Sequence, residues 1–135
     1  MDTNLRMHVI SIARSVRQWV EEKDQLQRNP SGDLGGWCAI ASAELWRRLD
    51  KNNIKSEIHI SEDEWTFHVF VVVEDHIVDV TATQFGHYEP VVIMHHRLAE
   101  SKDYWNTNDI FKNPVDLIKH QKKNGHSNQE IAYSK

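Results

Sequence analysis

The spacing of apolar residues changes once along this 135-residue chain, and that change constrains the fold more than any other feature. Up to about residue 51, apolar side chains recur every three or four residues, as on one face of a helix. From about residue 54 they alternate with polar residues or form β-branched runs, as in strands. The order predicts an α+β domain in which N-terminal helices pack on an antiparallel β-sheet.

Two helices are expected before the change of period. The first should end before the loop at 28–36, RNPSGDLGG, which holds one proline and three glycines. The second should run from Trp37 to about Lys51. The apolar stripe of the first helix is Leu5, Val9, Ile12, Val16 and Trp19 or Val20; that of the second is Ala41, Leu45 and Leu49.

The second half of the chain predicts strands and one more helix. Strands are expected in NIKSEIHIS (53–61), TFHVFVVV (66–73), HIVDVTAT (76–83) and EPVVIM (89–94), whereas 95–112 shows no clear period. In NPVDLIKHQKKNG (113–125), Asn113 suits a helix N-cap, Pro114 the first turn and Gly125 the stop. We therefore expect a single domain over 1–125 and a polar tail over 126–135.

Composition excludes several classes of protein. Sixteen basic and twenty acidic residues give a net charge of −4, which argues against a nucleic-acid partner. A single cysteine rules out an intramolecular disulfide framework and a multi-thiolate metal site. The N-terminal segment has no long apolar core, so neither a Sec signal nor a membrane span is predicted. We expect a soluble, cytoplasmic protein; delivery as a secreted effector and the oligomeric state stay open.

The one cysteine, Cys38, lies where two glycines end and a helix begins. Free N–H groups and the positive end of the helix dipole stabilise a thiolate there, and the same N–H groups can hold an oxyanion. Gly36 would let a substrate approach the backbone closely. The alternative is that Cys38 is a small buried apolar residue.

A candidate base and its partner interrupt the two most apolar strands. A two-residue turn at Glu74 and Asp75 places Asp79 diagonally across from His68 on one face of the hairpin. A turn one residue longer would send the two side chains to opposite faces. The pair could be a structural hydrogen bond within the sheet, or His68 could take the thiol proton while Asp79 orients the imidazole.

The order Cys, His, Asp, in GGWCAIASAELWRRL (35–49) and WTFHVFVVVEDHIVDVTATQF (65–85), resembles the transglutaminase-like and compact papain-like cysteine enzymes. The resemblance covers about half of the chain. It implies a papain-like core with Cys38, His68 and Asp79 as the catalytic residues. It also implies acyl transfer on peptide or protein amides through a thioester, as in peptidases, glutamine deamidases and transglutaminases, without a cofactor.

The sequence departs from many such enzymes around the cysteine. Trp37 precedes it and Ala39 follows, where many relatives have an aromatic residue after the cysteine, and no glutamine lies shortly upstream. The second oxyanion donor is therefore open between Gln84 and a backbone N–H, and Trp37 and Gly36 are candidates for contacting substrate.

Two other classes compete with a cysteine hydrolase. One is a non-catalytic domain of the same fold that binds a protein partner. The other is a metal-dependent hydrolase using His87, His95 and His96, but these lack a helical HExxH arrangement or a cysteine pairing, so no metal site is predicted.

Overall fold

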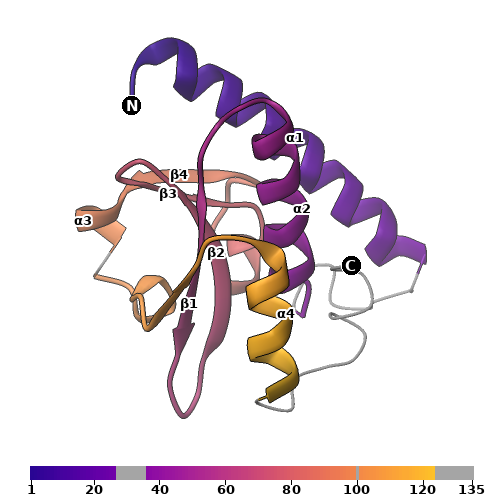
Figure 1. The fold of residues 1–135 in the computed structure, drawn as a ribbon, viewed down its shortest axis with the longest axis vertical. Coiled ribbons are helices and arrows are strands. Elements are labelled where there is room, and N and C mark those ends of the chain that lie inside the picture. The colour runs from indigo at the N-terminus through magenta and orange to yellow at the C-terminus, as the bar shows by residue number, and fades with distance from the viewer. Residues whose placement is uncertain (27–35, 100, 124–135) are drawn as a thin grey trace.

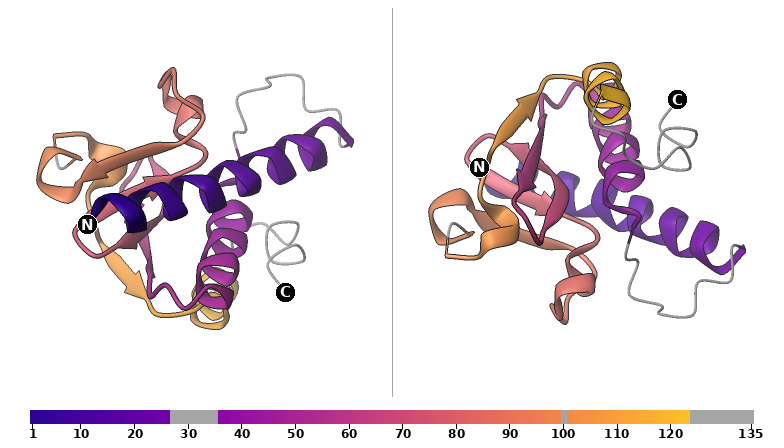
Figure 2. Two further views of the ribbon diagram at one scale, coloured as in Figure 1. Left: turned by 90° about the horizontal axis from the view of Figure 1, so that it is seen from above. Right: turned by 90° about the horizontal axis from the view of Figure 1, so that it is seen from below.

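The computed structural model describes residues 1–26, 36–99 and 101–123. It is an α+β structure in which two N-terminal helices precede a five-stranded antiparallel sheet of order β4-β3-β2-β1-β5, as the change of period predicts (Figures 1 and 2). The elements are α1 (Thr3–Leu26), α2 (Cys38–Lys51), β1 (Glu57–Glu62), β2 (Phe67–Val73), β3 (His76–Asp79), η1 (Ala82–Phe85), β4 (Val92–His95), α3 (His96–Ala99), η2 (Asp103–Trp105), β5 (Asp109–Phe111) and α4 (Pro114–Lys123).

The first two helices form one packed pair. Asp2 caps α1, since its carboxylate accepts the N–H of Leu5 at 2.7 Å. Near the other end of α1, the buried Asp24 accepts the indole N–H of Trp37 at 2.8 Å, which joins α1 to the start of α2. The predicted loop at 28–36 lies outside the described residues except for Gly36. None of the helices in the described part of the chain has the length and apolar content needed to cross a membrane.

The central hairpin has the predicted register. Val73 pairs with His76 and Val71 with Val78, so the turn consists of Glu74 and Asp75 alone. The first turn residue adopts a left-handed φ of 52°. Because side chains alternate along a strand, this register alone decides which residues of β2 and β3 share a face.

The two faces of the sheet carry different layers. On one face Val69, Val71 and Val73 of β2 pack against α1, α2 and α4. On the other face Phe70 and Val72 pack with Ile77 of β3 and with Trp105 of η2. By alternation His68 and Asp79 belong to this second face, close to the end of the sheet where β2 begins and β3 ends.

The chain after β3 departs most from expectation. The strand expected in 89–94 is β4, but it begins at Val92 and extends to His95. The unassigned segment supplies α3, η2 and the edge strand β5, in which Ile110 pairs with His59 of β1. The last described helix begins as predicted, since Asn113 accepts the N–H of Asp116 at 2.9 Å. Gly125 and the predicted tail at 126–135 lie outside the described residues.

A buried arginine of α1 hydrogen-bonds to the chain between β3 and β4. The guanidinium of Arg17 donates to the carbonyl of Val80 and the hydroxyl of Thr83, each at 3.0 Å, and to the carbonyl of Pro90 at 3.4 Å. Its Nε is 2.7 Å from the carboxylate of Glu21. Arg17 therefore adds polar contacts to the apolar packing of Val80 and Val91 that holds this segment on the helix layer.

The end of α2 gives a test of the backbone geometry. Asn53 follows the C-cap with a left-handed φ of 59°, and the N–H of Ile54 returns to the carbonyl of Leu49 at 3.0 Å. Asn53→Gly should keep or raise the free energy of unfolding by up to about 1 kcal/mol, whereas Asn53→Val should lower it by about 1–2 kcal/mol, because a β-branched residue is strained there. Urea denaturation of the two variants measures the difference, and equal stabilities would contradict it.

Candidate active site

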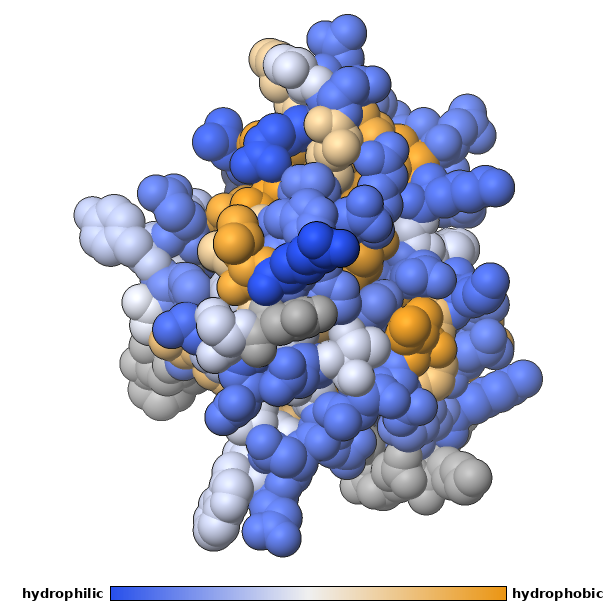
Figure 3. Space-filling model, turned by 90° about the vertical axis from the view of Figure 1, so that its left-hand side faces the viewer, coloured by the Kyte–Doolittle hydropathy of each residue, from blue (hydrophilic) through white to orange (hydrophobic). Residues whose placement is uncertain are grey.

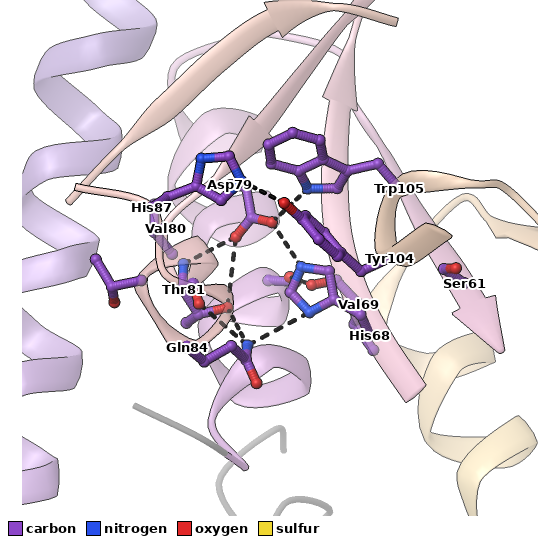
Figure 4. A network of polar contacts seen from close by, with 12 residues as sticks. Ser61, His68, Val69, Asp79, Val80, Thr81, Gln84, His87, Tyr104 and Trp105 are labelled. Atoms are coloured by element: carbon purple, nitrogen blue, oxygen red, sulfur yellow. Dashed lines mark hydrogen bonds and ion pairs between the residues drawn. The ribbon is translucent and has the colours of Figure 1, made fainter. Parts of the chain in front are cut away.

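The structure brings His68 and Asp79 together. The imidazole Nε2 of His68 lies 2.5 Å from Oδ2 of Asp79, and both side chains are almost wholly buried (Figure 4). One residue comes from the start of β2 and the other from the end of β3, as the hairpin register requires. With Nε2 engaged by the carboxylate, Nδ1 is the ring nitrogen left for proton exchange.

The carboxylate of Asp79 is held by two further donors. The indole N–H of Trp105 donates to Oδ2 at 2.8 Å, and the backbone N–H of Thr81 donates to Oδ1 at 2.8 Å (Figure 4). Both oxygens are thus hydrogen-bonded, which a buried carboxylate requires. Sequence reasoning missed Trp105; the only signal was that a tryptophan N–H needs a partner when buried.

Burial and the neighbouring charges shift the pKa values of His68 and Asp79 in opposite directions. Burial alone would lower the pKa of His68, but the charge and hydrogen bond of Asp79, with a smaller contribution from Cys38, raise it to about 10. Burial also opposes ionisation of Asp79, yet His68, Trp105 and Thr81 outweigh it and hold the pKa of this carboxyl below its usual range. The arrangement therefore favours an imidazolium beside a carboxylate.

Cys38 interacts with His68 from the start of α2. The thiol is close enough that its hydrogen bond and charge contribute to the raised pKa of the imidazole. Cys38 is the first residue of α2, is 3% exposed and packs with Val69, the neighbour of His68. One turn later the hydroxyl of Ser42 donates to the carbonyl of Val69 at 3.1 Å, which fixes α2 against β2 beside the site.

Of the other candidate residues, Gln84 lies beside His68, whereas the ring of Trp37 lies in the contact between α1 and α2. Gln84 lies beside the site on η1, with its amide nitrogen 3.4 Å from Nδ1 of His68 and 3.1 Å from the carbonyl of Thr81. Gly36 has a left-handed φ of 87°, and a Cβ added there would meet no heavy atom of the described residues within 4 Å. The indole of Trp37 is buried and bonded to Asp24, so its ring belongs to the α1–α2 contact.

Two stacked aromatic rings, those of Phe85 and Tyr104, lie next to the imidazole and are called the aromatic wall below. The rings of Phe85 and Tyr104 are stacked with centroids 4.1 Å apart, and the edge contact between Phe85 and His68 has centroids 4.7 Å apart. The hydroxyl of Tyr104 is hydrogen-bonded to Nε2 of His87. Phe85 and Tyr104 are only partly buried, so this wall offers a flat surface at the edge of the site.

Comparison of the chain with protein-family models, curated proteins and solved structures finds no match. Among the described residues, no group of three or more His, Cys, Asp or Glu side chains is arranged to hold a metal ion. The function must therefore be argued from the site itself.

The raised pKa of His68 predicts a pH dependence of stability. The unfolded imidazole titrates near pH 6.5 and the folded one near 10, so the charged pair contributes fully below about pH 6.5 and is lost as the pH rises toward 10. In a Cys38→Ala background, which removes titration of the thiol, the free energy of unfolding should fall by up to about 1.4 kcal/mol per pH unit between pH 6.5 and 9.

The matched variant for this measurement is Cys38→Ala/Asp79→Asn, which removes the charge that raises the pKa of His68. Urea denaturation of both variants over the same pH range gives the two slopes. The Asn variant should show the smaller slope, whatever its absolute stability. Equal slopes would contradict a charged His68–Asp79 pair.

Proposed function

We propose that this protein is a cysteine-dependent hydrolase or acyltransferase that acts on peptide or protein amides through a thioester. In this proposal Cys38 is the nucleophile, His68 the base and then acid, and Asp79 the residue that orients the imidazole. The core formed by α2, β2 and β3 is then of the papain-like or transglutaminase-like kind.

One observation carries the proposal. The single thiol of the chain interacts with an imidazole whose Nε2 lies 2.5 Å from an oxygen of a buried carboxylate. The three residues come from three separate elements, α2, β2 and β3. A purely structural His–Asp pair would not require a thiol at a helix N-terminus on the remaining side of the ring.

In the proposed acyl transfer, His68 exchanges protons with Cys38 and the substrate while Asp79 holds Nε2 of the ring. Because the pKa of His68 is raised to about 10, the imidazole already holds the proton of Cys38 in the resting site. The thiolate of this ion pair attacks the amide carbon, and the carbonyl oxygen becomes an oxyanion. The imidazolium then protonates the leaving amine, or ammonia if the substrate is a glutamine side chain, as the C–N bond breaks. In the second half, His68 takes a proton from the water or acceptor amine that attacks the thioester carbon, and the C–S bond then breaks. Cys38 leaves as the thiolate, which restores the thiolate–imidazolium pair. Asp79 stays ionised throughout.

Two sources of oxyanion donors lie on the thiol side of the site. Trp37, the N-cap of α2, makes no side-chain cap, which leaves the first-turn N–H groups without that partner. The amide of Gln84 lies near Nδ1 of His68, on the side of the ring away from Asp79. Both therefore support acyl transfer. Among the described residues none stands within 4 Å of a Cβ added at Gly36, which supports approach of a substrate backbone beside Cys38.

The thiol should be reactive at acidic pH because of His68. Alkylation by iodoacetamide, followed by mass spectrometry from about pH 4 to 9, should persist well below pH 7 in the wild type and be lost there in His68→Ala. As Cys38 is the only cysteine, the adduct on the peptide that holds Cys38 is the one that reports on this site. His8→Ala, an exposed histidine on α1, is the matched control and should behave as the wild type.

A different result would support the competing hypothesis. If Cys38 reacts only above about pH 8, with the same profile in wild type and His68→Ala, the thiol is not activated and the catalytic proposal is wrong. A non-catalytic domain that binds a protein partner would then be the better account. If activation is found, glutamine-bearing proteins and peptides are the substrates to test, with released ammonia separating deamidation from proteolysis.

Trp105 should matter as a positioning residue for Asp79. Trp105→Phe keeps a ring but removes the N–H donated to Oδ2, so the imidazole is held less firmly and alkylation of Cys38 at about pH 6 should slow by about tenfold. Tyr104→Phe is the control, because the hydroxyl it removes is bonded to His87 and not to Asp79. Equal rates in the two variants, with circular dichroism showing both folded, would contradict this role.

A further inference from the structure

We propose that the groove between α1 and β4 binds an extended acidic peptide segment of a partner protein, which adds a strand to the free edge of the sheet. This site is separate from the Cys38–His68–Asp79 site and does not depend on its chemistry. The groove has a volume of about 510 Å³ and is lined by Arg6, Ile10 and Arg14 on one side and by residues 87–94 on the other.

β4 runs antiparallel to α1 along this groove. At one end Arg17 of α1 donates to the carbonyl of Pro90. At the other end Arg6 lies near enough to His76 to affect its pKa, and His76 pairs with His95 of β4. Figure 3 shows a face of the molecule on which apolar residues gather in the upper half, with hydrophilic residues between them. Most of the residues that line the groove are apolar, among them Ile10, Val91 and Ile93.

The outer edge of β4 carries unpaired backbone groups. β4 is the terminal strand of the sheet. The N–H of His96 donates to the carbonyl of Asp75 at 2.8 Å, so in this antiparallel ladder the alternate residues Val91 and Ile93 direct their N–H and C=O outward. No described residue hydrogen-bonds to those groups. Such an edge is a template for another strand.

The distance between the groove-lining residues of α1 matches the distance between alternate residues of an added strand. Arg6, Ile10 and Arg14 are spaced four residues apart, about 6 Å per step along a helix. Two residues of an extended strand also span about 6.6 Å, and side chains two apart point to the same face. A peptide strand beside β4 would therefore present residues one, three and five to Arg6, Ile10 and Arg14 in turn. On the face of the peptide that meets α1, this spacing favours a charged residue, then an apolar residue, then a second charged residue.

The positive charges of the groove favour binding of an acidic peptide. Arg6 and Arg14 are both exposed, and neither forms an ion pair within the described part of the chain. Carboxylates at positions one and five of the peptide would meet them, and an aliphatic residue at position three would meet Ile10. Glu89 also lines the groove and disfavours a longer acidic run. The segments 27–35 and 124–135 of this chain each hold one acidic residue, so they do not fit the pattern.

Fluorescence anisotropy with a labelled ten-residue peptide centred on Glu-Thr-Val-Thr-Glu tests the proposal. We expect binding that weakens with added salt. In the double variant Arg6→Glu/Arg14→Glu, binding should weaken at least about tenfold, because two attractions become repulsions. Arg97→Glu, which changes an exposed arginine outside the groove, should leave binding unchanged.

Peptide variants test the strand geometry without altering the protein. N-methylation of the alternate amides that face β4 should abolish binding, while N-methylation of the other set should not. A peptide with Lys in place of both Glu residues should not bind. Cys38→Ala should bind as the wild type, so this proposal and the catalytic one fail independently.

Three outcomes would overturn the proposal. They are no binding of the Glu peptide, equal loss of affinity from either N-methylated set, and equal affinity of the Glu and Lys peptides. Sedimentation measurements provide a further check: a stable dimer dissociated by the double arginine variant would show that a second copy of the chain occupies the groove instead.

Discussion

The buried carboxylate of Asp79 is the group on which the site, and much of the second face of the sheet, depends. It lies at the end of β3 and accepts hydrogen bonds from three directions: His68 of β2, Trp105 of η2 and the backbone of Thr81. Removing any one donor leaves a charge in an apolar surrounding without full compensation. This side chain thus links β2, η2 and the start of the chain after β3, in addition to the apolar packing among the same elements.

The parts that sequence could predict are those governed by short-range rules. The change of period gives the α+β class, because side-chain alternation and helical stripes are local properties. The turn at Glu74 and Asp75 fixes the register, and the register alone places Asp79 beside His68. Asn113 is predicted as an N-cap from its own position and that of Pro114. Each of these follows from residues that are near one another in the sequence, without any contact between distant segments.

The parts that sequence could not predict depend on contacts between distant segments. β5 has three residues and no period, and it is a strand only because Ile110 and its neighbours pair with β1. Trp105 meets Asp79 across 26 positions, and nothing near either residue indicates the contact. The groove along β4 likewise appears only when α1 lies beside a strand some eighty residues later. Tertiary placement, and not local preference, creates these features.

The buried Arg17 gives the two proposed sites a common support. Its guanidinium holds Val80, Thr83 and Pro90, the chain that leads from Asp79 to β4. Local unfolding of that segment would release Gln84 from His68 and β4 from α1 in the same event. We therefore expect the end of the sheet that holds His68 and Asp79 and the free edge of the sheet to open as one cooperative unit. Amide hydrogen exchange along 80–92 would then report the opening of both with a single free energy.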